Sequence, residues 1–152
     1  MEEAIQAKNK IIQNIKKAFR WTPYPGNENI VCSYIDEGYF TYKSFRKKHW
    51  RKVDLEMVFK QRESLIFMTP SAIRFYIPAF MIAALTDTEG IDVGLNIIFF
   101  VLRDMKKDFQ IFSKREKEGI KAYLEYFVHY PYDSFSKNDA IKVLGLYWNT
   151  ND

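Results

Sequence analysis

The spacing of apolar residues along the chain predicts a mainly α-helical protein. Near the N-terminus, Ile12, Ile15 and Phe19 recur at three- and four-residue intervals, which is typical of a helix with one apolar face. This spacing predicts a helix over residues 2–20. The prolines, glycine and asparagines of WTPYPGNEN at 21–29 then predict a loop.

Three further helices are predicted by their N-terminal capping residues. Asp36, Asp54 and Thr69 each have an apolar residue just before them and another four positions after them, the arrangement of a cap with a hydrophobic staple. Proline follows Thr69, and proline is favoured at the first position of a helix. We therefore expect helices to begin near these three residues. The segment 30–35 is expected to be extended or to lead into the first of these helices.

The C-terminal half carries three more helical patterns. IDVGLNIIFFVLRDMKK is apolar and ends in basic residues, which the helix dipole favours. Ser113 with Glu116 has the spacing of a capping box, and Ser136 with Asp139 is a weaker version of it. The helices expected from these signals span about 91–107, 114–129 and 137–148.

Together these elements predict a mainly α fold, a single compact domain of six or seven helices over residues 1–152. A chain of 152 residues fits one domain with its own core. Only six glycines and five prolines supply turns, which argues against a many-stranded sandwich or barrel. The sequence shows neither a repeat nor a linker long enough to divide the chain.

The segment PSAIRFYIPAFMIAALT predicts a central helix at about 70–86, because it is apolar on nearly all sides. Its single charged residue is Arg74, and Pro78 lies four positions later. Proline lacks the N–H that would bond the Arg74 carbonyl. We therefore expect this helix to be kinked at Pro78.

The guanidinium of Arg74 needs a partner if it is buried, and a carboxylate is the expected one. Glu37 is the first candidate because it opens another predicted core helix, and Glu125 and Asp36 follow. In the alternative interpretation, Arg74 and Tyr76 line a pocket at the kink and bind an anionic group.

No sequence motif assigns a catalytic or metal-binding function. The motifs GxGxxG, GxxxxGK[ST], HExxH and CxxC are absent. His49 and His129 have no histidine, cysteine or acidic partner at the spacing of metal ligands. Cys32 is expected to be a buried, inert thiol, although a partner close in space stays open. We predict no catalytic residue, no metal and no cofactor.

Two pairs of acidic residues are a further candidate for acid/base chemistry. Asp36 and Glu37 stand at a predicted helix start, and Asp87 and Glu89 stand in a predicted loop. We expect them to cap a helix and to be solvated in the loop, respectively. An enzymatic role is left open, and the absence of a motif favours a protein that is not an enzyme.

The formal net charge of +4 comes from 23 basic and 19 acidic residues and is mild and mixed. The segment FRKKHWRK at 45–52 alternates basic residues with rings, a pattern of nucleic-acid binding. We expect instead that Phe45 and Trp50 face the core and that the bases are a solvated helix end. Nucleic-acid binding through 45–52 therefore ranks last among the functions considered.

The sequence carries no expected membrane or export signal. The N-terminus is charged and amphipathic and lacks the apolar core of a signal peptide. The nearly uncharged run 75–86 is shorter than the ~20 apolar residues of a membrane span. One cysteine forms no internal disulfide, which is simplest in a reducing compartment. We expect a cytoplasmic protein that makes no membrane contact.

The segment LIFMTPSAIRFYIPAFM resembles the signature of an uncharacterised bacterial family of small helical proteins, (T/S)P-x-A-x-R-(Y/F)-Y-(L/I)-P-A-F. The similarity extends back through KKAFRWTPYPGNENIV, the acidic residue Glu37 and Trp50, and covers roughly residues 15–85. Ile73 stands where the family more often has an aromatic residue, a departure that affects packing. The resemblance implies a bacterial origin and a helical fold, and it implies no activity or catalytic residue.

The first functional hypothesis is a non-enzymatic protein-interaction module, either an adaptor or an inhibitor of the immunity type. Aromatic residues make up 17% of the chain, and Tyr, Trp and Arg are favoured anchors of protein interfaces. The partner is then another protein, and the oligomeric state stays open. The expected interaction surface consists of Trp21, Tyr24, Trp50, Tyr130 and Tyr132.

The second hypothesis is a small-ligand binder or an enzyme. Its site is formed by Arg74, Tyr76 and Glu37 around the kink at Pro78.

Overall fold

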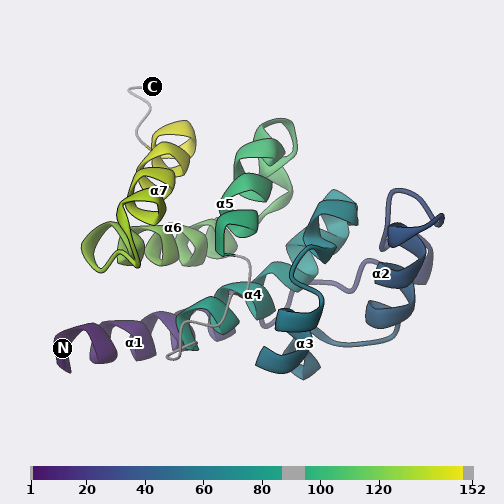
Figure 1. The fold of residues 1–152 in the computed structure, drawn as a ribbon, viewed down its shortest axis with the longest axis horizontal. Coiled ribbons are helices and arrows are strands. Elements are labelled where there is room, and N and C mark those ends of the chain that lie inside the picture. Colours follow the sequence, from purple (N-terminus) through teal and green to yellow (C-terminus); the bar gives the residue numbers. More distant parts are fainter. Residues whose placement is uncertain (1, 87–94, 149–152) are drawn as a thin grey trace.

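The computed structural model describes residues 2–86 and 95–148. The α-helices are α1 Glu2–Ala18, α2 Glu37–Phe45, α3 Leu55–Lys60, α4 Pro70–Thr86, α5 Leu95–Asp104, α6 Lys114–His129 and α7 Ser134–Tyr147 (Figure 1). The short 3₁₀ helices are η1 Asn27–Asn29, η2 Trp50–Lys52, η3 Ser64–Phe67, η4 Met105–Lys107 and η5 Phe109–Ile111. These ranges contain seven α-helices and no β-strand, which confirms the mainly α fold with six or seven helices in one compact domain.

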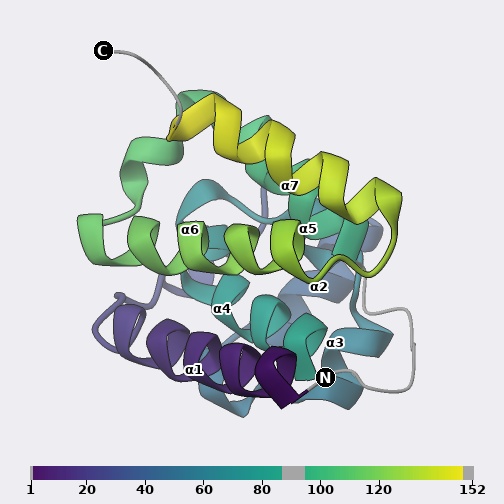
Figure 2. The ribbon, with the colours of Figure 1, turned by 90° about the vertical axis from the view of Figure 1, so that its left-hand side faces the viewer.

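Helix α4 is the central element, as its uniformly apolar sequence predicts. It contacts α1, α3 and α5 (Figures 1 and 2), and 11 of its 17 residues are buried. The helix continues through Pro78, which is itself buried. The kink expected at Pro78 stays a prediction.

The C-terminal helices form a second layer beside α1. Helix α6 contacts both α1 and α7, and Figure 2 shows α1 and α6 running in opposite directions. Gly119 on α6 permits this close approach, because a Cβ atom added there would lie 3.1 Å from the Cβ of Ala18. That distance is shorter than ordinary van der Waals contact between carbon atoms.

The residues that follow η1 pair with the residues that lead into α4. Val31 and Met68 form an isolated antiparallel bridge. The Cys32 N–H donates to the Phe67 carbonyl at 3.0 Å, and the Thr69 N–H donates to the Ile30 carbonyl at 3.1 Å. The pairing is confined to Val31 and its neighbours, and Ile30 has a helical backbone with φ −87° and ψ −45°, so extended structure over the whole of 30–35 stays a prediction.

Helices α2, α3 and α4 begin next to Asp36, Asp54 and Thr69 as predicted, but only Asp54 and Thr69 act as caps. The Asp54 carboxylate accepts from the Met57 N–H at 2.9 Å, and the Thr69 hydroxyl accepts from the Ala72 N–H at 3.1 Å. The capping role predicted for Asp36 is wrong, because its side chain makes no cap hydrogen bond and its φ is 54°. A capping residue normally has a β-region backbone.

The predicted start of α6 is correct, whereas the predicted start of α7 is not. Helix α6 begins with the predicted capping box of Ser113 and Glu116. Helix α7 begins at Ser134, three residues before the predicted start, because Asp133 and Ser136 form its capping box in place of Ser136 and Asp139. In the predicted helix 91–107, residues 91–94 lie outside the described ranges, and α5 is followed directly by η4.

Candidate functional site

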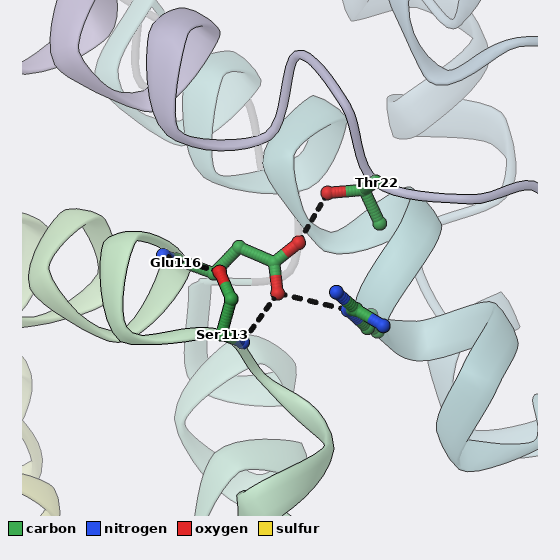
Figure 3. Close-up of polar contacts among 4 residues, drawn as sticks. Thr22, Ser113 and Glu116 are labelled. Atoms are coloured by element: carbon green, nitrogen blue, oxygen red, sulfur yellow. Dashed lines mark hydrogen bonds and ion pairs between the residues drawn. The ribbon is translucent and has the colours of Figure 1, made fainter.

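Glu116 lies where three segments of the chain meet (Figure 3). It is the third residue of α6 and is 2% exposed. Its Oε1 accepts from the Ser113 N–H at 2.7 Å and from the Arg74 Nε at 2.8 Å. Its Oε2 accepts from the hydroxyl of Thr22. We call Glu116, Arg74, Thr22 and Ser113 the Glu116 junction.

The junction compensates a buried carboxylate with three donors. Removing an ionised carboxylate from water costs several kcal/mol, and only an ion pair with further hydrogen bonds offsets this. The side chain of Arg74 is 23% exposed, so the pair lies at the boundary between core and solvent. The junction thereby joins the loop after α1, the N-terminal half of α4 and the start of α6.

The expected partners of Arg74 were wrong. Glu37 and Asp36 are exposed near the start of α2, and Glu125 lies 3.9 Å from Lys121 on the surface of α6. The sequence predicts only a capping role for Glu116, in the capping box with Ser113. A carboxylate has about four acceptor positions, so the cap leaves positions free for Arg74 and Thr22.

Tyr76 is fully buried and contacts the protein's own backbone. Its hydroxyl lies 2.7 Å from the carbonyl oxygens of both Phe45 and Lys48. Burial is the main cause that raises the pKa of Tyr76. These contacts hold the chain that follows α2 against α4.

Glu37 lies apart from the contacts of Arg74 and Tyr76. It lines a cavity of about 210 Å³ together with Thr41 and Ser64, and neither Arg74 nor Tyr76 lines that cavity. A ligand-binding role for Arg74, Tyr76 and Glu37 stays a prediction.

A larger cavity, of about 610 Å³, lies between α1, η2 and α4. We call it the basic cavity, because its lining includes Lys16, Lys17, Arg20 and Arg51. The sequence did not indicate this site. Its cations come from two segments 31 or more residues apart, and only the fold brings them together.

The predicted interaction residues differ widely in exposure. Trp21 is 78% exposed and Tyr132 is 70% exposed, whereas Tyr24 and Tyr130 are each 37% exposed. Trp50 is only 2% exposed, so it was wrongly placed on an interaction surface. Phe135 at the start of α7, 76% exposed, was not among the predicted residues.

The phenylalanine and the tryptophan of the basic segment 45–52 are not accessible to a nucleic-acid base. Phe45 and Trp50 are buried, which confirms that they face the core. The guanidinium of Arg51 lies 5.2 Å from the Trp50 ring, so this ring is covered by a cation of its own chain. Base stacking, which nucleic-acid binding by such a segment requires, has no exposed Phe or Trp here.

The lone cysteine and the histidines carry no metal site in the part of the chain that the structure describes. Cys32 is exposed, so the expectation of a buried thiol was wrong; its short extended segment lies at the surface. The His49 Nδ1 accepts from the Arg51 N–H at 3.1 Å, and partial burial, then the charges of Arg51 and Lys52, lower the pKa of His49.

Over residues 2–86 and 95–148, no group of three or more His, Cys, Asp or Glu side chains could hold a metal ion. The acidic residues Asp87 and Glu89 lie outside these ranges. Among the helices within them, none is both long enough and apolar enough to cross a membrane.

Comparison with known proteins identifies a family. The model of a family of unknown function (DUF6714) matches residues 7–152, so the chain belongs to that family. The match agrees with the expected resemblance to an uncharacterised family and extends beyond residues 15–85. No curated protein and no solved structure matches the chain.

Proposed function

We propose that this member of the DUF6714 family is a non-enzymatic module that binds an acidic protein partner, as an adaptor or as an inhibitor of the immunity type. The observation that carries the proposal is the contrast between two adjacent residues. Trp21 is 78% exposed, while Thr22 is 8% exposed and donates its hydroxyl to buried Glu116. An exposed tryptophan ring therefore extends from backbone that the core holds in place.

This arrangement is that of a preorganised interface anchor. The Thr22 N–H also donates to the Phe19 carbonyl at 3.2 Å, which closes the turn after α1. The guanidinium of Arg20 lies 5.3 Å from the Trp21 ring. Trp and Arg dominate binding energy at protein interfaces, and a fixed backbone reduces the entropy lost on association.

The charges around Trp21 favour an acidic partner. Lys17 and Arg20 line the basic cavity and also a second cavity of about 390 Å³, which Arg115 of α6 shares. We call Trp21, Lys17, Arg20 and Arg115 the Trp21 surface. Within residues 2–86 and 95–148, none of its cations forms an ion pair, although Glu118 also lines the second cavity. Complementary charge accelerates association and sets specificity.

The test is affinity capture from extracts of the source cells, followed by reconstitution with the purified partner. We compare the wild-type chain with Trp21→Ala and with Tyr132→Ala, a matched control that removes another exposed ring. We expect one stoichiometric protein to bind the wild type and the control. Its affinity for Trp21→Ala should be at least about 30-fold weaker, equivalent to about 2 kcal/mol.

Salt dependence tests the charge of the partner separately. Binding to the wild type should weaken at high ionic strength because exposed charge pairs are screened. A partner that binds Trp21→Ala as tightly as wild type would refute this surface. The absence of any stoichiometric protein would refute the function itself.

A further inference from the structure

We propose that the basic cavity binds a small molecule that joins a carboxylate to an apolar body. Lys17 and Arg20 belong both to this cavity and to the Trp21 surface, whereas Lys16, Arg51 and the apolar wall lie outside that surface. Variants at these outer residues therefore test this site separately from the proposed protein partner. The argument rests on the apolar wall and the cationic rim, with Trp50 beside them as a reporter.

The wall of the basic cavity is mainly apolar. It includes Val53, Leu55, Ala79, Ile82 and Ala83, which come from the chain around α3 and from the C-terminal half of α4. The volume of about 610 Å³ falls within the ~300–1,000 Å³ that is usual for small-molecule sites. An aliphatic chain placed there would leave water and contact these side chains.

The rim of the same cavity is cationic. Lys16, Lys17, Arg20 and Arg51 all line it, and Asp54 is the one acidic residue of the lining. The Asp54 carboxylate already accepts from the Met57 N–H as the cap of α3. Within the described ranges the four cations have no ion pair, so their charge is available to a carboxylate.

Arg51 is held at this rim by its own chain. Its Nη2 lies 3.5 Å from the Lys16 carbonyl, and its guanidinium lies over the Trp50 ring. The stacking leaves the other guanidinium N–H groups free for a ligand, since a guanidinium has five donors. Arg51 therefore joins α1 to η2 and presents positive charge beside the apolar wall.

Trp50 lies beside the wall and carries an unpaired donor. It lines the basic cavity, is 2% exposed, and its indole N–H has no hydrogen-bond partner in the described part of the chain. Buried donors without a partner are few in folded proteins, and each calls for an explanation such as an absent polar group. The N–H itself is buried, so Trp50 serves here as a reporter beside the cavity and its donor is not counted as a ligand contact.

The probe is decanoate, a ten-carbon carboxylate. Decanol has the same tail without the charge, and acetate has the charge without the tail. Binding to the full chain is measured by calorimetry and by ¹H–¹⁵N NMR, in which the Trp50 indole N–H reports on the wall. We expect decanoate to bind at least about tenfold more tightly than decanol and acetate, and to shift the Trp50 signal. Equal affinity for decanoate and decanol overturns the proposal.

Matched variants locate the site. Lys16→Gln and Arg51→Gln should each weaken decanoate binding about three- to tenfold and leave decanol binding unchanged. Ile82→Ser should weaken both ligands, because it removes part of the apolar wall. Lys10→Gln is the control, since it removes the same charge from α1 outside the cavity.

Trp21→Ala should bind decanoate like the wild type, so a failure of the protein-binding proposal leaves this one intact. Three results would refute the cavity as a ligand site. They are no decanoate binding, binding that Lys16→Gln and Arg51→Gln do not weaken, and NMR shifts confined to residues outside the lining. An absence of decanoate binding would also be expected if the cavity instead receives a side chain of a protein partner.

Discussion

Helices α6 and α7 begin with the same local motif and use it differently. In both, the cap side chain accepts from the N–H of the third helical residue, whose side chain bonds the cap N–H in return. In α7, the side-chain hydrogen bonds of Asp133 and Ser136 stay between these two residues. In α6, Glu116 also bonds Arg74 and Thr22, which lie 42 and 94 positions away.

The difference follows from the side chain at the third position. Serine has one hydroxyl, and Ser136 uses it within the cap. Glutamate is longer, is charged and has two oxygens, so one residue serves as both cap and tertiary contact. The same local signal therefore has a local effect in α7 and joins three segments in α6.

Replacing Arg74 by Met should give the largest effect. The change leaves the Glu116 carboxylate buried at 2% exposure with only two donors. Breaking a buried pair on one side costs about 3–5 kcal/mol, and we expect about 3 kcal/mol because Arg74 is partly exposed. Urea unfolding gives the value.

Lys121→Met is the matched control for Arg74→Met, because it removes the cation of a surface pair. Lys121 and Glu125 are each about half exposed, with Nζ and Oε1 3.9 Å apart. Such pairs contribute about 0–1 kcal/mol. Equal losses for Arg74→Met and Lys121→Met would show that the Glu116 junction is an ordinary surface contact.

Thr22→Val should give the second-largest loss of unfolding free energy. Valine keeps the shape of threonine but removes the hydroxyl that donates to Glu116 Oε2, and hydrogen bonds to charged groups contribute about 1.5–3 kcal/mol. The control is Thr41→Val, because buried Thr41 donates to a neutral hydroxyl, that of Ser64, at 3.3 Å. We expect the free energy of unfolding to fall by about 2 kcal/mol for Thr22→Val and by less than about 1 kcal/mol for the control.

Removing the two cap side chains should give nearly equal, smaller effects. Asp133→Ala and Ser113→Ala each remove one acceptor for a helix N–H, which costs about 1 kcal/mol. Equal losses of unfolding free energy would show that the cap hydrogen bond contributes the same in both helices. The larger effects expected at α6 would then come from the contacts of Glu116 with Arg74 and Thr22. A loss for Ser113→Ala as large as that for Arg74→Met would contradict this assignment of the effects.

The smallest expected effect on stability concerns Tyr147, near the end of α7, and it appears at alkaline pH. The Tyr147 hydroxyl donates to the Leu102 carbonyl at 2.7 Å, and burial, then the charge of Asp104, raise the pKa of Tyr147 to about 12. A raised pKa means that the folded state holds the proton longer, so this stability is present below pH ~10 and is lost as pH rises toward ~12.

Tyr147→Phe isolates this contribution. Between about pH 9 and about pH 11, the wild type should lose more free energy of unfolding than Tyr147→Phe. The difference should be below about 1 kcal/mol, because Tyr147 is partly exposed and its charge is screened. Identical pH profiles in urea unfolding would show that this hydroxyl is not linked to stability.

The sequence predicted the helices and most of their caps, because these depend on residues that are close together in the chain. The caps of α3, α4 and α6 act over three residues, and the uniformly apolar sequence of α4 predicted its central position. The cap at Asp133 was not predicted, because Ser136 and Asp139 have the spacing of a capping box as well. Local signals therefore gave the helices, with some errors at their ends.

The sequence could not predict which side chains meet across the fold. Arg74 showed by its charge that it needs an acid, but several carboxylates satisfied that rule equally well. Trp21 and Trp50 are both tryptophans near basic residues, yet one is 78% and the other 2% exposed. The basic cavity depends on how α1, η2 and α4 meet, and its residues share no motif.

The most direct test of the central claim is a double-mutant cycle between Arg74→Met and Glu116→Gln, measured by urea unfolding. If Arg74 stabilises the fold by compensating the buried charge of Glu116, Arg74→Met should cost about 3 kcal/mol in the wild type. In the Glu116→Gln background it should cost less than about 1 kcal/mol, because no charge remains to be stranded. The same cost in both backgrounds would contradict the Glu116 junction as the contact that joins α1, α4 and α6.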